Sequence, residues 1–423
     1  MNANTLTKEE KIIVFFSSAS HFFAHFYILV FPALVMPISR ALQLPLSRVV
    51  DLSFYMYLLY GLISIPWGLL SDHVGHKWAM GWGVIIAGTG MFLAGLVSLF
   101  GASLFVFSAA LALVGIGCSA YHPSGMALVS QGVRHRGKAL GVIGIVGNIG
   151  MASVPFTVGL LNYVLGWQKG LMVLGVVGAL LGLAIITSPL KVEKGKDKIK
   201  LEKLKKEHAG KLFFIFLIGV GFAGLMYRSF TVVLPSYLEL ELGNITQVFL
   251  NFVNTRFRPL KDTPAFNTLT ANLVATAIYL VGIFGQYIGG KVADRASLKW
   301  AYMLAFCFAS PFILGMILFS NSILIVSAGM FLFFTLGMQP VENSLVAFLT
   351  PAKWRSVSYG LKFTVLFGTG SFAVKIVSLI ESSWGIKSVM WMVGFFLLMV
   401  VLNMVVFLIV SRGKKIDQKV TVQ

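Results

Sequence analysis

Charged side chains are scarce in this chain of 423 residues, and acidic ones are scarcer still. Only 12% of the residues are charged, and Asp and Glu together number 15, against 57% hydrophobic residues. A soluble protein of this length cannot bury so much apolar surface, so the composition excludes an ordinary soluble domain. The chain has two cysteines, Cys118 and Cys307, and both lie in apolar stretches. A disulfide framework is therefore not expected.

Several chemical signatures are also missing. There is no Gly-x4-Gly-Lys-Ser/Thr loop for ATP, and no Ser/His/Asp cluster for hydrolysis. Neither the cysteines nor the scattered histidines have a metal-ligand spacing, so the sequence predicts no metal site and no cofactor. An intramembrane enzyme would need a cluster such as His-His-Asp, and His21 and His25 have no acidic neighbour in the sequence. We therefore do not expect an enzyme.

Long hydrophobic runs are what the chain has in abundance, and its mean hydropathy is +0.86. Runs of about 20 apolar residues predict membrane-spanning helices. About twelve such runs predict an all-α integral membrane protein. The first begins after Lys11 and has no small-x-small cleavage site, so it is not a cleavable signal. The runs are centred on 12–36, 48–70, 78–99, 103–130, 137–163, 168–189, 212–238, 269–291, 300–319, 322–349, 356–380 and 387–410.

Basic residues are distributed unevenly among the segments between these runs. Most of the 34 Lys and Arg residues fall in the segments that share a side with the N-terminus. The positive-inside rule places that side, and both termini, in the cytoplasm. The net charge of +19 is explained in the same way, as a set of topology determinants beside membrane lipid. We therefore do not expect nucleic-acid binding.

A short turn is duplicated between the two halves of the chain. The segment 68–79 and the segment 290–301 share Gly, Asp, Lys, Trp and Ala in the same register. The segments 134–141 and 353–360 also match, each with a basic pair followed by glycine at the same offset. Such a repeat predicts two related half-molecules. The repeated polar positions are Gly68, Asp72 and Lys77 in the first copy, and Gly290, Asp294 and Lys299 in the second.

The repeat and the spans together predict the domain organisation. We expect an N-terminal six-helix bundle over 1–190, a basic cytoplasmic linker over 191–211, and a C-terminal six-helix bundle over 212–423 with an external loop near 239–267. The linker is either a solvated basic segment or a short interfacial helix with Ile199, Leu201 and Leu204 on one face.

These motifs resemble the major facilitator superfamily over nearly the whole chain. Gly68-x3-Asp72-x2-Gly75-x-Lys77 is similar to that superfamily's loop between helices two and three, although Ser297 replaces the glycine in the second copy. The segments 113–123 and 141–150 are similar to bacterial fosmidomycin-resistance-type transporters, a drug and anion efflux branch. The resemblance implies a major facilitator fold, with two pseudo-symmetric six-helix bundles around a cavity, and a proton-driven carrier.

The duplicated Asp turns have a physical role in such a carrier. Asp72 and Asp294 end helices at the cytoplasmic face, where each can pair with basic residues or helix N-termini of the neighbouring bundle. Such a pair closes an inner gate in one state and breaks in the other. Lys77 and Lys299 supply compensating charge. The alternative is that each turn is merely a tight loop.

Helix five carries a second resemblance. Gly141-x8-Gly150-x3-Val154-Pro155-x2-Val158-Gly159 is similar to the Gly/Pro pattern of the superfamily's antiporters, with valine at two of the glycine positions. The pattern favours export, although ordinary helix packing also uses small residues. The chain departs from many proton-coupled members in span four, which lacks their Arg. His122 is its only ionisable group, so coupling must use other residues.

Ionisable groups at membrane depth are costly and are therefore candidates for function. Glu342 in span ten lies three residues after Gln339, and Lys362 lies at a comparable depth in span eleven. A Glu342–Lys362 pair is feasible, and its protonation can couple protons to helix movement; a fixed structural pair is the alternative. His122 is a further proton-coupling candidate.

The remaining candidates are assigned to substrate binding. Arg228 lies near the middle of span seven, where a guanidinium favours an anionic ligand. Lys375 either does the same or extends to the outer interface. His21 and His25 share one face of span one and can relay protons, bind substrate or hold a neighbouring helix. Gln339 completes the predicted set.

The sequence thus predicts a secondary transporter that moves a small organic solute, anionic or amphipathic, with proton-coupled efflux favoured. Proton-coupled uptake and a non-transporting sensor or assembly protein remain alternatives. We expect a monomer in a bacterial cytoplasmic membrane that binds its small-molecule substrate, protons and membrane lipid, since no organelle signal or lipidation motif is evident.

Overall fold

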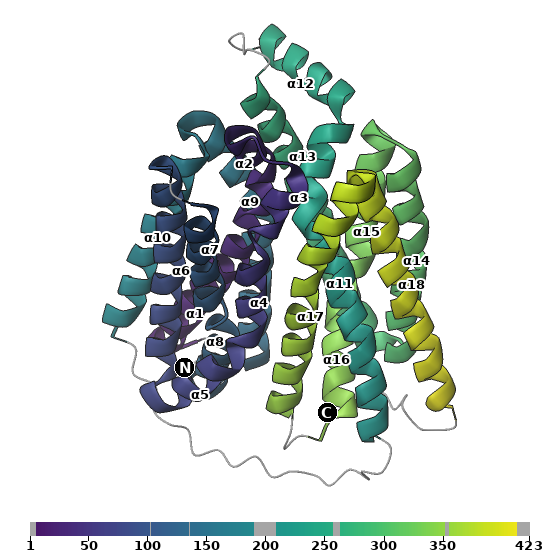
Figure 1. Ribbon diagram of the computed structural model, residues 1–423. Coiled ribbons are helices and arrows are strands. Elements are labelled where there is room, and N and C mark those ends of the chain that lie inside the picture. The colour runs from purple at the N-terminus through teal and green to yellow at the C-terminus, as the bar shows by residue number, and fades with distance from the viewer. Residues whose placement is uncertain are drawn as a thin grey trace. The chain divides into compact units, whose positions relative to one another are not determined.

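Helices account for every regular element in the part of the chain that the structure describes (Figure 1). The structure is a computed structural model that describes residues 6–101, 103–134, 136–189, 209–256, 263–351 and 355–412. The predicted linker over 191–211 lies almost entirely outside these residues. The chain divides into two compact units, Met1–Ile199 with Pro264–Asn272, and Lys200–Thr263 with Leu273–Gln423.

The described residues of the first unit form the short 3-10 helix η1, the helices α1–α10 and the first turns of α13. Its elements are α1 (Lys8–Val30), η1 (Pro32–Leu34), α2 (Val35–Leu42), α3 (Leu46–Asp51), α4 (Phe54–Leu62), α5 (Ser64–Val74), α6 (His76–Leu99), α7 (Leu104–Cys118), α8 (Tyr121–Gly132), α9 (Arg136–Leu165) and α10 (Trp167–Thr187). Helix α1 packs on α9, and α6 packs on α7 and α10.

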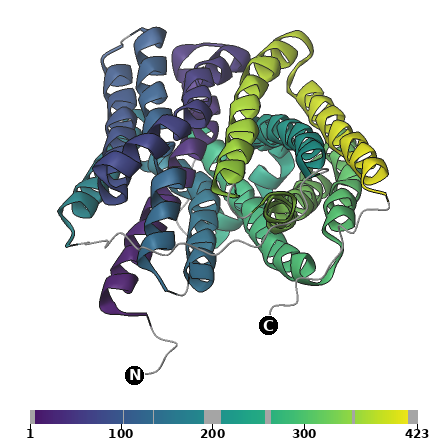
Figure 2. The same cartoon turned by 90° about the horizontal axis from the view of Figure 1, so that it is seen from below.

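The second unit follows the same plan with longer helices. Its elements are α11 (Ala209–Glu241), α12 (Gly243–Arg256), α13 (Pro264–Arg295, whose first turns group with the first unit), α14 (Leu298–Leu318), α15 (Asn321–Gly337), α16 (Gln339–Leu349), α17 (Arg355–Trp384) and α18 (Ile386–Val410). Helix α11 packs on α17 and α18, and α14 packs on α15 and α18. Figure 2 shows the helices of each unit from below.

The predicted number of membrane spans is confirmed. Eleven helical segments among the described residues are long and apolar enough to cross a membrane, and a bent pair makes up to twelve. The bent pair is Leu46–Leu62 with Ser64–Val74, which meet at 48°. It occupies the place of the predicted second span. The predicted external loop near 239–267 was expected to be irregular, whereas residues 243–256 form helix α12.

The N-terminus of α1 is fixed by a reciprocal cap. The Thr7 side chain accepts from the backbone N–H of Glu10 at 3.2 Å, and the Glu10 carboxylate accepts from the Thr7 N–H at 2.8 Å. This capping box satisfies two N–H groups that the helix itself leaves unpaired. The second carboxylate oxygen of Glu10 accepts from the backbone N–H of Arg134 at 2.8 Å. One buried side chain therefore ties the start of α1 to the turn between α8 and α9.

Glycines let α9 approach α1 closely. A Cβ on Gly150 would lie 2.6 Å from the carbonyl oxygen of Phe22, and a Cβ on Gly147 would collide with the imidazole of His21. Real Cβ atoms cannot occupy such positions without moving the neighbouring helix. Gly150 of the predicted helix-five pattern therefore lies where α9 approaches α1, and close helix approach in membranes depends on small residues.

In each unit the fourth span is broken near its middle. Helix α7 ends at Cys118 and α8 begins at Tyr121, while α15 ends at Gly337 and α16 begins at Gln339. Proline follows each break, as Pro123 in α8 and Pro340 in α16. Proline has no N–H to donate and fits best in the first turn of a helix, so it favours a new helix start at these points. Both breaks carry polar side chains.

Substituting Gly150 with Ala tests the close contact between α1 and α9. We expect Gly150→Ala to lower the free energy of unfolding by about 1–3 kcal/mol, because the added methyl group meets the backbone of α1. Gly141→Ala on the same helix is the matched control, since a Cβ there has no atom within 4 Å. It should be neutral or slightly stabilising. Thermal unfolding of the two purified variants in the same detergent measures the difference, and equal midpoints would contradict the packing argument.

Candidate functional site

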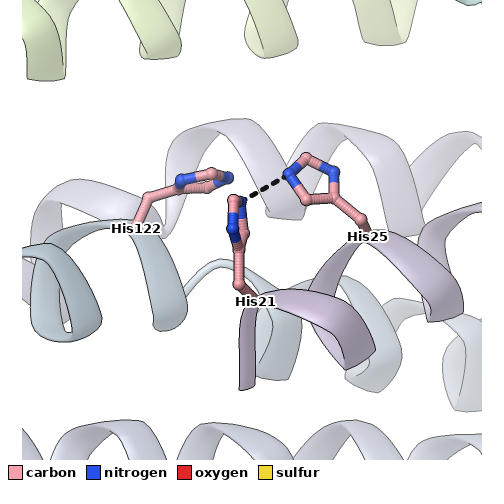
Figure 3. A group of neighbouring side chains, drawn as sticks. All are labelled: His21, His25 and His122. Atoms are coloured by element: carbon pink, nitrogen blue, oxygen red, sulfur yellow. Dashed lines mark hydrogen bonds between the residues drawn. The ribbon is translucent and has the colours of Figure 1, made fainter. Parts of the chain in front are cut away.

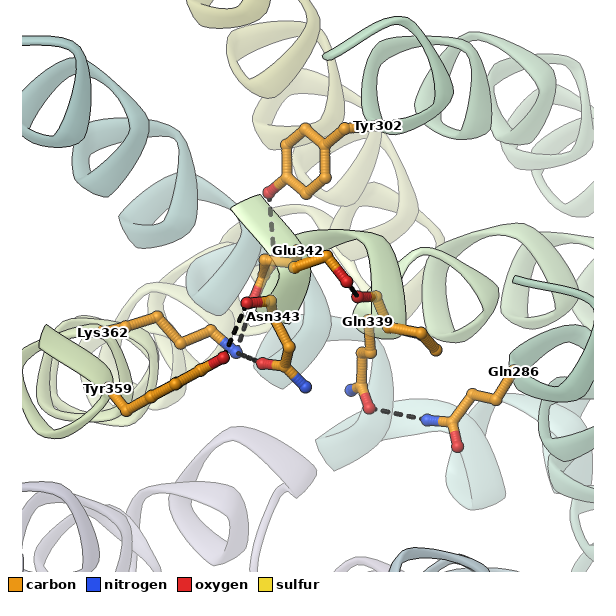
Figure 4. Close-up of polar contacts among 9 residues, drawn as sticks. Gln286, Tyr302, Gln339, Glu342, Asn343, Tyr359 and Lys362 are labelled. Carbon is orange, nitrogen blue, oxygen red and sulfur yellow. Dashed lines mark hydrogen bonds and ion pairs between the residues drawn. The ribbon is translucent and has the colours of Figure 1, made fainter. Parts of the chain in front are cut away.

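A buried ion pair lies inside the second unit. The Nζ atom of Lys362 is 2.5 Å from Oε1 of Glu342, and the two side chains are 2% and 1% exposed. Glu342 comes from the first turn of α16, and Lys362 comes from α17 (Figure 4). The structure therefore brings together the two residues that were predicted to pair. Their predicted role in proton coupling stays a prediction.

Neutral groups complete the surroundings of this pair. Tyr302 from α14 donates to Oε2 of Glu342 at 3.1 Å, and Lys362 donates to Oδ1 of Asn343 at 3.2 Å. The Tyr359 hydroxyl donates to the backbone carbonyl of Asn343 at 2.8 Å, across the α16–α17 contact. Both charges are thus solvated by protein dipoles in place of water, which is the condition under which buried charges are tolerated.

The break in the fourth span of this unit assists the carboxylate. Glu342 is the fourth residue of α16 and lies in its first turn. A helix N-terminus carries partial positive charge and stabilises an anion in its first turn. Gln339, which was predicted to bind substrate, also lies at this break. Its Oε1 atom accepts a hydrogen bond from Gln286 of α13 at 2.6 Å.

Three histidines gather inside the first unit (Figure 3). His21 and His25 lie on α1, and His122 is the second residue of α8. The Nε2 atoms of His21 and His25 are 2.9 Å apart, and one ring nitrogen from each of the three residues lies within 4.8 Å of the others. All three side chains are partly exposed. The sequence placed His21 and His25 on one face but did not predict that His122 would join them.

Backbone and hydroxyl groups orient this histidine cluster, His21–His25–His122. Nδ1 of His21 lies 2.9 Å from the carbonyl oxygen of Ile143 on α9. A carbonyl only accepts, so Nδ1 of His21 carries the proton and its Nε2 atom is an acceptor. Hence His25 donates to His21 from its own Nε2. The Tyr60 hydroxyl lies 3.2 Å from Nε2 of His122.

The other predicted substrate residues have different environments. Arg228 is 4% exposed, within α11 of the second unit. Lys375 is exposed on α17, which agrees with either of its two predicted roles. Arg228 therefore needs compensation inside the protein, whereas Lys375 does not.

The duplicated turns are similar in sequence but differ in backbone. Asp72 and Asp294 are exposed in the last turns of α5 and α13. Gly75 alone separates α5 from α6 and has φ +94°, a conformation that favours glycine. Ser297 has φ −65°, and two residues separate α13 from α14. The second copy thus dispenses with glycine by lengthening its turn by one residue.

The remaining predicted gate residues are also placed differently in the two copies. Lys77 donates to the carbonyl of Ser188, the residue that caps α10, at 2.7 Å. This contact brings a cation to the negative end of α10. A Cβ on Gly68 would be 3.4 Å from Pro123, while Gly290 has open space around it. Lys299 lies in the first turn of α14. The gating role of both turns stays a prediction.

Sequence reasoning missed three partners of these clusters: Tyr302, Gln286 and Tyr60. Nothing in the local sequence distinguishes any of them from an interfacial or packing residue. The position of these three side chains deep in the membrane was the one available signal. A buried phenol or amide needs a hydrogen-bond partner, so each must contact another polar group.

Comparison with known proteins agrees with this architecture. Residues 13–253, more than half of the chain, match the Major Facilitator Superfamily. The chain belongs to the major facilitator superfamily. It is similar to a crystal structure of a bacterial homologue of the human lysosomal transporter Spinster in an inward-facing, occupied conformation, with a TM-score of 0.75, 13% identity and coverage of 96% of this chain and 97% of that one.

The same homologue in an inward-facing, unoccupied conformation has a TM-score of 0.73 and 14% identity, with coverage of 96% of this chain and 98% of that one. No sequence among curated proteins matches. At these identities the likeness concerns the fold. Membership of the superfamily makes this chain a multi-pass membrane protein and a secondary transporter that works by alternating access, rather than an enzyme.

A double-mutant cycle tests whether the Glu342–Lys362 pair acts as a unit. We expect Glu342→Gln and Lys362→Met each to cost about 3–5 kcal/mol of stability, because each leaves a buried charge uncompensated, while the double variant recovers most of the loss. The pair Glu241–Lys387, with N···O 3.0 Å, is the control, because Lys387 is 54% exposed and Glu241 is 14% exposed, and its coupling should be well below that of the buried pair. Equilibrium unfolding in detergent gives both coupling energies. If the stability losses of the two single variants simply add in the double variant, Glu342 and Lys362 do not act as a unit.

Proposed function

We propose that this protein is a proton-coupled exporter of small organic anions or amphipathic solutes. The observation that carries the proposal is the Glu342–Lys362 ion pair. Its two side chains are 1% and 2% exposed and lie within membrane-spanning helices. Charges at membrane depth are expensive, and those that are retained commonly serve ion pathways. This unit therefore holds an acid whose charge state matters to the packing of two helices.

Protonation of Glu342 is the proposed coupling step. The carboxylate and the ammonium attract each other while both are charged, and this attraction holds α16 against α17. A proton on Glu342 removes the attraction and leaves Lys362 with the amide oxygen of Asn343, at 3.2 Å, as its remaining partner. The two helices then lose their strongest mutual contact. A proton can thus change the relative stability of two arrangements of the unit, which is what alternating access requires.

Two further hydrogen bonds limit how far α16 can move when Glu342 is protonated. Tyr302 donates to Glu342 from α14, so the carboxylate is held from a third helix. Tyr359 bonds to the backbone of Asn343 and keeps a neutral link between α16 and α17 when the ion pair is lost. Protonation therefore weakens the contact without releasing the helices entirely. His122 of the histidine cluster is the further candidate on the proton pathway.

Arg228 supports an anionic substrate. Its guanidinium is 4% exposed within α11, and a planar guanidinium binds carboxylate or phosphate through two parallel hydrogen bonds. Lys375, Gln339, His21 and His25 are the other proposed substrate residues. In the spans cations outnumber the one acid at depth, Glu342, which favours a negatively charged or amphipathic solute.

The fifth span, helix α9, favours export as the direction of transport. Its Gly/Pro pattern over 141–159 is similar to that of antiporters and includes Pro155. Export by exchange with protons is therefore preferred over uptake by symport. A non-transporting sensor is disfavoured, since a scaffold has no need of a buried Glu and Arg. The proposed carrier is a monomer in a bacterial cytoplasmic membrane, with the two Asp turns as its inner gates.

Replacement of Glu342 tests proton coupling. We expect Glu342→Gln to keep substrate exchange across a proteoliposome membrane but to lose accumulation driven by a pH gradient, because the side chain no longer binds a titratable proton. Glu241→Gln, which replaces an acid paired with the exposed Lys387 of the same unit, should transport normally. Opposed solute and proton fluxes in the unaltered protein indicate export by antiport, whereas parallel fluxes indicate symport. Normal gradient-driven transport by Glu342→Gln would remove this residue from the mechanism.

Replacement of Arg228 tests the charge of the substrate. We expect Arg228→Ala to weaken binding of organic anions by about ten- to hundredfold, since hydrogen bonds to a charged group contribute about 1.5–3 kcal/mol, and to leave neutral ligands unaffected. Arg295→Ala, an exposed arginine at the end of α13, is the control. Binding is measured by tryptophan fluorescence with a panel of carboxylates, phosphonates and uncharged analogues. An equal loss for neutral and anionic ligands would contradict the assignment.

A further inference from the structure

The histidine cluster, His21–His25–His122, has a geometry that neither proton coupling nor anion binding requires. The ring centroids of His21 and His25 are 4.6 Å apart, and each lies 5.6 Å or 5.5 Å from that of His122. The three rings therefore form a nearly equilateral triangle. They face one another across the contact between α1 and α8 (Figure 3).

These separations are those of imidazoles around one tetrahedral ion. A Zn–N bond is about 2 Å long, and a ring nitrogen lies roughly 1 Å from its ring centre, so the centres of two tetrahedral ligands lie about 5 Å apart. The observed centroid distances, 4.6–5.6 Å, bracket this value. The nitrogen atoms, which lie within 4.8 Å of one another, need only small side-chain rotations to meet one ion.

The first histidine already has the partner of a metal ligand. Its Nδ1–H is directed at the carbonyl of Ile143, 2.9 Å away, which leaves Nε2 with its lone pair toward His25. Ligating histidines are held in this way by a carbonyl or carboxylate on the second nitrogen. Gly147 makes the contact feasible, because a Cβ there would occupy the position of the His21 ring. The Tyr60 hydroxyl lies 3.2 Å from Nε2 of His122 and limits the rotation of that ring.

The chemistry of the cluster selects a class of ion. Its three donors are imidazole nitrogens, and no carboxylate belongs to the group among the described residues. Imidazole suits Zn²⁺, Co²⁺, Ni²⁺ and Cu²⁺, whereas Mg²⁺ and Ca²⁺ prefer oxygen. Each imidazole binds a metal ion through the lone pair of a neutral ring. Since the side chains are partly exposed, water can supply a fourth ligand.

We propose that His21, His25 and His122 bind one divalent transition-metal ion of the Zn²⁺ class. Binding replaces the hydrogen bond from His25 to His21. The His25 proton moves from Nε2 to Nδ1, and both Nε2 lone pairs then face the ion. The ion links α1 to the second half of the broken fourth span. This site goes beyond the proposed transport function, and its occupancy is measured without any transport assay.

The test uses the full-length protein without an affinity tag, in detergent and free of chelator. Calorimetric titration with Zn²⁺ should give saturable binding of one ion per chain, and the affinity should fall as the pH drops below neutrality, because protons compete for the imidazoles. Co²⁺ in the same site should show the intense visible absorption of tetrahedral nitrogen coordination. Weak bands of an octahedral hydrated ion, or no saturable binding, would overturn the proposal.

Variants connect the binding to these three residues. We expect His25→Gln and His122→Gln each to weaken Zn²⁺ binding at least tenfold, and His73→Gln, an exposed histidine on α5, to bind normally. Gly147→Ala removes no ligand but displaces His21, and it should weaken binding as well. Unchanged binding in the two cluster variants would refute the site. The absorption of Co²⁺ in the unaltered protein decides the question if either variant fails to fold.

Discussion

The polar clusters of this molecule depend on one constraint: an ionisable side chain in a membrane needs a partner within the protein. In hydrocarbon no water is present to solvate a carboxylate or an imidazole, so each must find its hydrogen bonds in neighbouring helices. Glu342 obtains them from Lys362 and Tyr302. In the first unit, the three histidines use one another, a backbone carbonyl and a tyrosine. Small residues elsewhere serve the same end, since close helices leave polar groups within reach of one another.

Both clusters lie at the same kind of place, the break in the fourth span of their unit. Pro123 and Pro340 lie just after these breaks, where the second half of each span begins as a new helix. The new helix start carries the acid Glu342 in the second unit and the histidine His122 in the first. The same position of a duplicated fold therefore holds different ionisable side chains in the two units.

The sequence predicted the fold well because hydropathy and the repeated turns act over whole helices. All predicted spans are present, and Glu342 was paired with the correct lysine because few charges occur at that depth. The clusters themselves were predicted poorly. His122 is far from His21 in sequence, and its proximity depends on how α1 crosses α8, which no local pattern encodes. The irregular external loop was wrong for residues 243–256, where polar residues had obscured a helix. Domain boundaries and site roles stay predictions.

The fit of Gly147 against the His21 ring links two positions that are distant in the chain. Neither can change freely while the other is kept, since any side chain at 147 occupies the space of the imidazole. During divergence the glycine should therefore persist only in lineages that retain a histidine at position 21. Where a smaller residue has replaced that histidine, position 147 becomes free to accept alanine or larger side chains. Positions 21 and 147 should thus show correlated substitutions in related sequences, between α1 and α9.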